Sequence, residues 1–125
     1  AYTKLIEVNP QLYAPYVQRA VSYTALKDYK NAIADYSKII ERSPEDPEYY
    51  EDRAQVYTRA GELQKAVDDY NKVIKLNPNY SIGYHERAQV FLKLDGKQTP
   101  RVVADEKKAK SLGYVSDAAT NIERD

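Results

Sequence analysis

Two nearly identical stretches, "DYSKIIERSP" at Asp35–Pro44 and "DYNKVIKLNP" at Asp69–Pro78, follow one another along the sequence. A third version, "AYTKLIEVNP", occupies Ala1–Pro10 and precedes the first by the same spacing. Internal periods of about 20–50 residues are typical of solenoids, in which each repeat packs against its neighbours. The chain of 125 residues therefore has room for about three and a half such units.

Other positions recur with the same period. An aromatic residue, an arginine, an alanine and a second aromatic residue follow one another in each unit, and a proline ends it. The columns are Tyr16, Tyr50 and Tyr84; Arg19, Arg53 and Arg87; Ala20, Ala54 and Ala88; Tyr23, Tyr57 and Phe91; and Pro10, Pro44 and Pro78. Intervals of four and three residues place such side chains on one face of a helix. Each unit is therefore predicted to be a pair of amphipathic helices, in which the small alanines allow close approach.

The residues at the predicted helix ends agree with this assignment. Asp46 and Thr99 each precede a proline, as N-cap acceptors do when proline occupies the first helical turn. Ser81 is a further candidate N-cap, and Gly61 lies where a left-handed residue would end a helix. We expect helices at residues 2–8, 14–26, 29–42, 47–60, 63–76, 82–94, 100–112 and 116–124.

These columns resemble the tetratricopeptide repeat family, whose motif is W-x2-L-G-x2-Y…A-x3-F…P. The matching positions are Tyr16, Arg19, Ala20, Tyr23, Ala32, Tyr36 and Pro44, and then Tyr50, Arg53, Ala54, Tyr57, Ala66, Tyr70 and Pro78. In both units Tyr replaces Trp and Arg replaces Leu. The resemblance implies an all-α fold, a right-handed superhelical solenoid of antiparallel helix pairs, with about eight helices and a C-terminal capping helix.

We expect residues 1–125 to form a single domain of this kind. Residues 1–12 are predicted to be the second helix of a truncated repeat, and 13–46 and 47–80 to be full repeats. Residues 81–115 are predicted to be a divergent terminal repeat, because the period holds there only with two residues inserted near "DGKQTP". Residues 116–125 would form the capping helix.

The N-terminal end raises a second possibility. Ala1 is not a methionine, and the frame begins inside a repeat, so we expect the natural chain to continue upstream. Without its covering helix, this edge would expose Tyr2, Leu5, Ile6 and Val8, and two copies of the chain could pair there. The chain would then be a homo-oligomer through the truncated N-terminal edge.

Composition excludes several function classes. Lysine and arginine number 19, as do aspartate and glutamate, so the basic excess of a general nucleic-acid binder is absent. No apolar run is long enough to span a membrane, and no targeting segment is visible. We therefore expect no nucleic-acid partner and no membrane insertion. The chain is predicted to be soluble, and the cytoplasm is slightly favoured.

Nothing in the sequence indicates catalysis. There is no cysteine, and His85 is the single histidine, so a zinc site of His and Cys ligands is untenable. The four glycines are scattered, which excludes a glycine-rich phosphate loop. The serines lie in helical or capping contexts and not in a strand–turn–helix elbow. We predict a protein that is not an enzyme and has no cofactor or metal.

The arginine column lies on the face that should meet the partner helix. Each arginine is followed by an aspartate at the same offset, lengthened only by the insertion in the last unit, which places the acid on the facing side of the second helix. The predicted pairs are Arg19 with Asp35, Arg53 with Asp69, and Arg87 with Asp105. A guanidinium fork can bind a carboxylate with two hydrogen bonds, and inward-facing charges are normally paired. A structural role is therefore favoured over an anion-binding ladder.

Stacked helix pairs form a concave face, which in tetratricopeptide-like arrays is lined by the first helix of each pair. The residues predicted there are Val17, Val21, Thr24, Glu51, Gln55, Thr58, His85, Gln89 and Leu92, with Asp52 and Glu86 at the edge. This groove would be apolar at one end and polar to mildly acidic further along. It would suit a peptide with an apolar anchor and some basic or amide character.

Some tetratricopeptide domains bind the acidic C-termini of heat-shock chaperones with a clamp of Lys, Asn and Arg. The matching positions here are Val17, Val21, Asp52, Ile82 and Glu86. None of these is basic or Asn, so an acidic-tail clamp is not expected. The predicted function is a non-catalytic scaffold that binds a peptide or protein segment in the groove. The alternative is a structural or self-associating segment of a larger repeat protein, with no ligand of its own.

Overall fold

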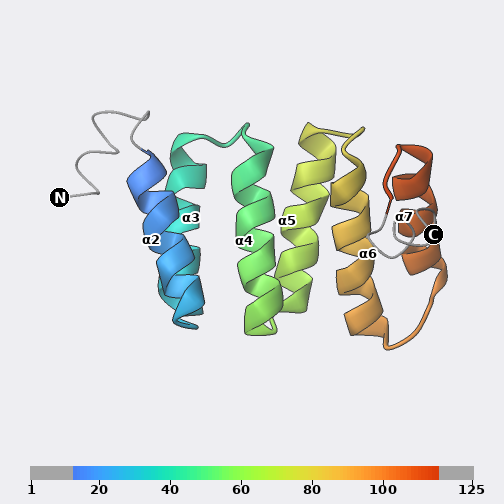
Figure 1. The fold of residues 1–125 in the computed structure, drawn as a ribbon, viewed down its shortest axis with the longest axis horizontal. Helices are drawn as coiled ribbons and strands as arrows, with labels where there is room; N and C mark the ends of the chain where they lie inside the picture. The colour runs from blue at the N-terminus through green and yellow to red at the C-terminus, as the bar shows by residue number, and fades with distance from the viewer. Residues whose placement is uncertain (1–12, 116–125) are drawn as a thin grey trace, which may run out of the picture.

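Six α-helices follow one another in chain order along the long axis of the computed structural model, which describes residues 13–115 (Figure 1). They are α2 (Tyr13–Ala25), α3 (Tyr29–Arg42), α4 (Pro47–Ala60), α5 (Leu63–Leu76), α6 (Ser81–Asp95) and α7 (Pro100–Ser111). Within residues 13–115 there is no strand. The predicted helices at 2–8 and 116–124, and the apolar edge at Tyr2, Leu5, Ile6 and Val8, lie outside the described residues.

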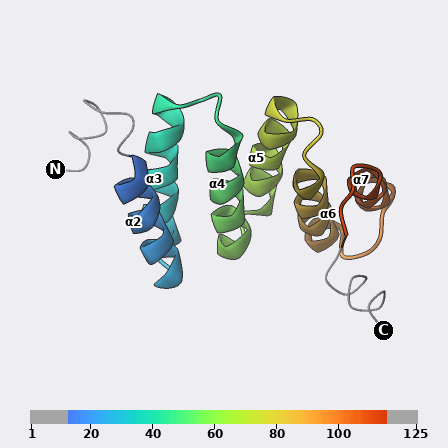
Figure 2. The ribbon, with the colours of Figure 1, turned by 45° about the horizontal axis from the view of Figure 1, so that its top comes forward.

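The helices form three antiparallel pairs, and the extensive contacts join each helix to the next one in the sequence. This is the neighbour-to-neighbour packing of a solenoid. The last pair differs from the others, because α7 is seen nearly end-on in Figure 2 while α2 to α5 are seen from the side. The loop before α7 contains the predicted insertion, and Arg101 crosses it to donate two hydrogen bonds, of 2.6 and 2.9 Å, to the Asp95 carboxylate.

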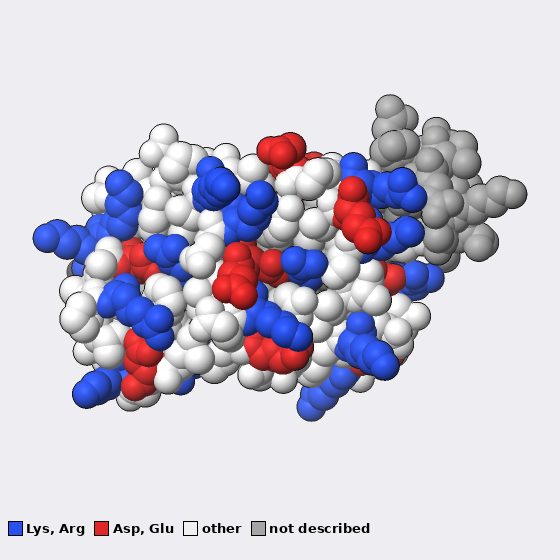
Figure 3. Space-filling model, turned by 180° about the vertical axis from the view of Figure 1, so that it is seen from behind, with Lys and Arg blue, Asp and Glu red and all other residues white. Residues whose placement is uncertain are grey.

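Charges of both signs are mixed on the face that is opposite to the view of Figure 1 (Figure 3). Lysine and arginine side chains alternate with aspartate and glutamate across the described part of this face. Nearby charges of opposite sign cancel each other's field at a distance. This face therefore lacks an extended region of one charge.

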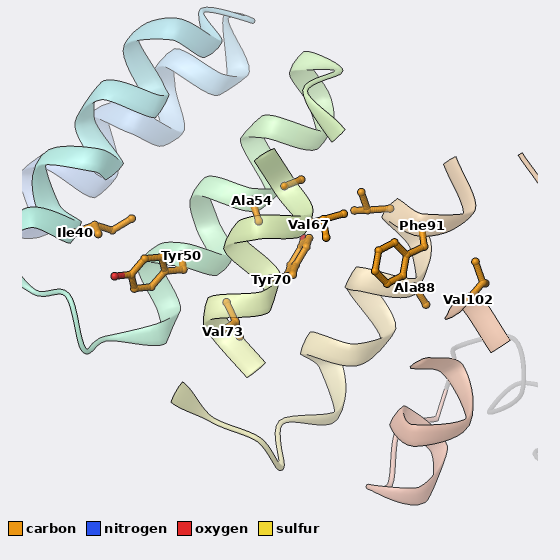
Figure 4. Packing of buried hydrophobic residues seen from close by; sticks show 11 residues of the cluster. Ile40, Tyr50, Ala54, Val67, Tyr70, Val73, Ala88, Phe91 and Val102 are labelled. Carbon is orange, nitrogen blue, oxygen red and sulfur yellow. The ribbon is translucent and has the colours of Figure 1, made fainter. Parts of the chain in front are cut away.

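The core lies between the helices in two clusters, and the partly buried Tyr49 packs against both. Figure 4 shows the larger cluster running from Ile40 of α3 to Val102 of α7. Alanines occupy the tightest positions, and six of those in the described residues have no exposed surface: Ala20, Ala32, Ala54, Ala66, Ala88 and Ala109. A larger side chain at these positions would force the helices apart. In the last pair Val102 is 1% exposed.

The tyrosine column explains why Tyr can replace Trp. Tyr50 and Tyr84 are buried, yet each hydroxyl reaches the end of the preceding unit. The Tyr50 hydroxyl donates a 2.9 Å hydrogen bond to the carbonyl of Pro44, and the Tyr84 hydroxyl donates one of 2.8 Å to the carbonyl of Pro78. A buried hydroxyl needs such a partner. The column therefore connects the proline that ends one unit to the first helix of the next.

The helix ends lie where the sequence predicted them, but only some of the predicted capping interactions form. Gly61 ends α4 in the left-handed region with φ of 82°, which glycine adopts without a steric penalty. The predicted caps at Asp46 and Thr99 occupy the N-cap positions, but neither side chain forms a capping hydrogen bond. Ser81 is the first residue of α6, and Tyr80 occupies its N-cap position. The prediction that Ser81 caps this helix was therefore wrong.

Candidate functional site

The structure brings the six residues of the predicted ion pairs together. Each arginine donates two hydrogen bonds, from Nε and Nη2, to the two carboxylate oxygens of its aspartate. The Nε and Nη2 distances are 2.9 and 2.6 Å for Arg19 with Asp35, 2.8 and 2.7 Å for Arg53 with Asp69, and 2.8 and 2.7 Å for Arg87 with Asp105. The three aspartates are 5–6% exposed. Each of these buried carboxylates therefore has the paired, hydrogen-bonded cation that a buried charge normally requires.

Two of the arginines also contact the preceding unit, which the sequence analysis missed. Arg53 Nη1 donates a 3.0 Å hydrogen bond to Ser37 Oγ, and Arg87 Nη1 donates one of 2.9 Å to Asn71 Oδ1. Ser37 and Asn71 occupy the same position in successive repeats. This recurrence of polar residues was the feature of the sequence from which the contact could have been predicted. Each of these arginines therefore joins three helices, because it contacts the second helix of its own pair and that of the pair before.

Three neighbouring cavities lie along the first helices of the pairs. The cavity between α2 and α4, of about 260 Å³, is lined by Val21, Thr24 and Asp52 among others. The cavity between α4 and α6, of about 600 Å³, is lined by Thr58, His85 and Gln89 among others. Gln55 and Arg59 line both of these cavities. A third, of about 590 Å³, lies between α6 and α7 and shares His85 and Gln89 with the second. We call these three adjoining cavities, which share lining residues, the groove.

Six of the nine predicted groove residues line this surface, namely Val21, Thr24, Gln55, Thr58, His85 and Gln89. Val17 and Leu92 are half-buried and pack against the two core clusters instead. Glu51 lines a separate cavity of about 200 Å³ with Tyr80 and Pro47. The stripe of helix residues that faces the groove is therefore narrower than predicted, because the residues at its edges pack against the core.

The two threonines present methyl groups rather than free hydroxyls. Thr24 Oγ1 donates a 2.8 Å hydrogen bond to the carbonyl of Ala20, and Thr58 Oγ1 donates one of 2.8 Å to that of Ala54. Threonine in a helix commonly bonds back to the carbonyl of the preceding turn. The polar character of the groove therefore comes from the glutamines and the charged side chains.

Two carboxyl groups face each other where α4, α5 and α6 meet. Glu86 Oε2 accepts hydrogen bonds of 3.2 Å from the Tyr70 hydroxyl and 3.1 Å from Gln55 Nε2. Glu51 accepts one of 2.9 Å from the Tyr80 hydroxyl. Glu86 Oε1 is buried and accepts no hydrogen bond from the N–H and O–H groups of residues 13–115. A proton held between the two carboxyls would satisfy this oxygen.

The surroundings of Glu86 favour that proton. Burial raises the pKa of Glu86 to about 8, and the facing Glu51 carboxyl contributes to the increase. Desolvation disfavours the charged form of an acid, and a second carboxyl at close range does the same. Asp52 follows the same rule, because burial, with Glu51 and Glu48 nearby, raises its pKa to about 6. Glu86 is therefore largely neutral at pH 7, although the sequence counts it as an anion.

His85 is held by two contacts from the last helix and the residues that follow it. Its Nδ1 lies 3.2 Å from Glu106 Oε2, and Gln89 Nε2 donates a 3.0 Å hydrogen bond to Glu106 Oε1. The imidazole stacks on the Tyr114 ring with centroids 4.2 Å apart and an interplanar angle of 17°. Tyr114 was missed because it follows the last full repeat. Gly113, a left-handed residue with φ of 100°, was the available signal for a turn there.

Two further observations concern ions and lipid. Within residues 13–115, no three histidine or acidic side chains are grouped so that they could hold a metal ion. None of the six described helices combines the length and the apolar character that crossing a bilayer requires.

Comparison with protein families gives two matches. Models described as tetratricopeptide repeat match residues 13–46 and 47–80, which together make up more than half of the chain. A search of the curated proteins by sequence gives no match.

Several solved structures share the fold. The first TPR of Spaghetti (RPAP3), bound to the HSP90 peptide SRMEEVD, is 24% identical with a TM-score of 0.76, over 91% of this chain and 89% of that one. The TPR2B domain of yeast Sti1, in a pHsp70 complex, is 20% identical with a TM-score of 0.74, over 90% and 88%. MamA is 20% identical with a TM-score of 0.73, over 90% of this chain and 65% of its own.

Proposed function

The chain belongs to the tetratricopeptide repeat family, and from this we propose that it is a non-catalytic scaffold that binds a peptide or protein segment in the groove. The observation that carries the proposal is that neighbouring cavities of the groove share lining residues. Gln55 and Arg59 line both the α2–α4 and the α4–α6 cavities, and His85 and Gln89 line both the α4–α6 and the α6–α7 cavities. An elongated ligand could therefore follow the row of helices, whereas isolated pockets would suit small molecules.

The chemistry of the groove supports a peptide ligand. Gln55 and Gln89 are exposed, and each uses its Nε2 group to donate to a glutamate of the protein. Their Oε1 atoms accept no hydrogen bond from the described residues, so each can accept one from a ligand. The N–H groups of a peptide backbone are such donors. The amides are also fixed in place by Glu86 and Glu106, which lowers the entropic cost of binding.

The structural neighbours add support for the class of ligand but not for its identity. The RPAP3 domain was solved with an HSP90 peptide and the Sti1 domain in a pHsp70 complex, which supports a peptide or protein segment as the ligand. The positions expected for an acidic-tail clamp here are Val17, Val21, Asp52, Ile82 and Glu86. Because none of them is basic or Asn, we do not propose that this chain binds those tails.

We also propose that residues 81–115 are a divergent third repeat and that the arginine–aspartate pairs hold each helix pair in register. The third pair keeps the Arg87–Asp105 ion pair and the hydrogen bond from Tyr84 to Pro78. These contacts repeat the pattern of the second unit. The truncated repeat at 1–12 and the capping helix at 116–125 stay predictions from the sequence.

The groove can be tested with a random decapeptide library displayed on phage. We expect the protein to enrich peptides over an uncoated support. Changing Gln55→Leu and Gln89→Leu together should weaken binding of the enriched peptides about tenfold, because each lost hydrogen bond contributes ~0.5–1.5 kcal/mol. Fluorescence anisotropy with labelled peptides measures this effect.

The matched control is Gln18→Leu with Gln64→Leu, since both glutamines are exposed and neither lines the groove. Circular dichroism would show that both variants are folded. If no peptide is enriched, or if the two variants bind equally well, the proposed function is wrong.

A further inference from the structure

We propose that the groove takes an acidic peptide, whose carboxylate side chains lie against Arg59 and Lys93 at the end of the α4–α6 cavity. This inference rests on the proposed function and specifies its partner. It reverses the expectation from the sequence, in which the groove was mildly acidic and suited a peptide with basic or amide character.

The cations of the groove are accessible. Arg59 and Lys93 are exposed, and both line the α4–α6 cavity. Neither forms an ion pair with the residues that the structure describes. They occupy the same position in successive repeats and lie in the last turns of α4 and α6. The repeat therefore places two unpaired positive charges at the same level of adjacent units.

The helix dipole alone does not account for this pair. A basic residue in the last turn is favoured by the partial negative charge of a helix C-terminus, and Arg42 of α3 and Lys75 of α5 occupy such positions too. Those two residues do not line the groove. The distinguishing feature of Arg59 and Lys93 is that both face one cavity, where a single ligand can contact them together.

The acids of the groove do not cancel these cations. Glu86 lies against Tyr70 and Gln55 and opposite another carboxyl, a setting in which its neutral form is favoured. Glu106 is engaged by His85 and Gln89. Asp52 lines the α2–α4 cavity and not the α4–α6 cavity. The charge that a ligand meets in the α4–α6 cavity is therefore mainly positive.

The positive region continues beyond this cavity. The α6–α7 cavity is lined by Lys107 and Lys110, both exposed, with Glu106 as its one acid. Because the chain as a whole has equal numbers of basic and acidic residues, this end of the groove is more positive than the average surface. Such complementarity selects ligands by charge and speeds their association.

The test uses the same decapeptide library and compares the net charge of the enriched peptides. We expect acidic peptides on the wild type and a shift toward basic peptides on the double variant Arg59→Glu with Lys93→Glu. An acidic peptide selected on the wild type should bind this variant at least tenfold more weakly, and its affinity for the wild type should fall with added salt. The variant Arg59→Ala with Lys93→Ala should show an intermediate loss.

The control variant is Lys75→Glu with Lys97→Glu, which changes the net charge equally at exposed positions outside the groove. It should select the same acidic peptides as the wild type. Enrichment of neutral or basic peptides that remain sensitive to Gln55→Leu and Gln89→Leu would overturn the charge inference and leave the proposed function intact. A wild type that enriches no peptides would overturn both.

Discussion

Asp69 and Glu86 are carboxyl groups on neighbouring helices, and the protein treats them in opposite ways. Asp69 is 5% exposed and receives two hydrogen bonds from Arg53, within one repeat. Glu86 lies at the junction of two repeats, where Tyr70, Gln55 and a second carboxyl face it. No lysine or arginine of residues 13–115 forms an ion pair with it. The first contact is an ion pair, while the second favours the protonated form of Glu86. The comparison shows that an ion pair joins the two helices of one repeat, whereas adjacent repeats are joined by hydrogen bonds with a neutral partner, including those from Arg53 to Ser37 and from Arg87 to Asn71.

Breaking the Arg53–Asp69 pair tests the first half of this comparison and should have the largest effect. Arg53→Leu leaves a buried carboxylate without its cation, which we expect to cost about 3–5 kcal/mol of unfolding free energy. Asp69→Ala should cost a similar amount, and the double variant clearly less than the sum. Urea denaturation of the four proteins measures the coupling.

The Arg101–Asp95 pair is the matched control, because its geometry is equally good while its side chains are more exposed, at 49% and 17% against 19% and 7% for Arg53 and Asp69. Solvent therefore screens it more strongly. The cycle of Arg101→Leu and Asp95→Ala should show a clearly smaller coupling than the cycle of Arg53→Leu and Asp69→Ala. Strictly additive effects of Arg53→Leu and Asp69→Ala would mean that the pair does not hold the repeat together.

The pH dependence of stability tests the second half of the comparison. The pKa of Glu86 is about 8 in the folded protein, against an ordinary value of 4.5 for glutamate. Between pH 4.5 and pH 8 the folded protein therefore binds this proton more tightly than the unfolded chain does. Unfolding then releases a proton, and the free energy of unfolding falls as pH rises through this window. Tyr70, Tyr80, Glu51 and Gln55 surround the group, and none of them supplies a compensating positive charge.

The variant Glu86→Gln isolates this effect, because an amide can keep the contacts of the protonated acid. Between pH 6 and 9 we expect the wild type to lose about 1–2 kcal/mol relative to the variant, after screening at this half-buried site is taken into account. The exposed acid Glu41 provides the control, since Glu41→Gln should keep the wild-type slope. Parallel curves for wild type and Glu86→Gln would contradict a shared proton at this junction.

The smallest effect concerns the neutral contacts between repeats. Tyr50→Phe and Tyr84→Phe each remove a hydroxyl that donates to a proline carbonyl of the preceding unit. We expect each to cost about 0.5–1.5 kcal/mol, with no dependence on pH between 6 and 9. Thermal unfolding monitored by circular dichroism measures the loss. A cost as large as that of Arg53→Leu would remove the distinction between the two kinds of junction.

Much of the fold could be predicted because the same residue pattern recurs in several units of the sequence. The six described helices begin and end within one residue of the expected bounds, including 29–42, 47–60 and 63–76. The offset from each arginine to its aspartate recurs in every unit, so the facing of the two helices followed from helical geometry. The assignment of residues 81–115 to a third repeat was harder to predict, because the insertion interrupts the period and occurs in no other unit.

The groove was predicted less well, for reasons of packing. Val17 and Leu92 share the helix stripe of the groove residues, but the adjacent helix covers them. Arg59 and Lys93 were overlooked because they come directly after Thr58 and Leu92, at the end of each predicted helix face. Tyr114 comes from the turn after α7, and no helical periodicity could place it against His85.

The sequence by itself determined the architecture of this protein, since a regular period with helical spacing inside it can bury its apolar faces only by stacking helix pairs. It also determined which arginine lies opposite which aspartate, because the number of residues between them is nearly constant. That number spans the loop between the two helices of a pair. Only the tertiary structure decided the charge of the groove. The protonation of Glu86 depends on its distance from Glu51, which belongs to another repeat, and on the exclusion of water by packing. The spacing of residues along the sequence determines neither of these.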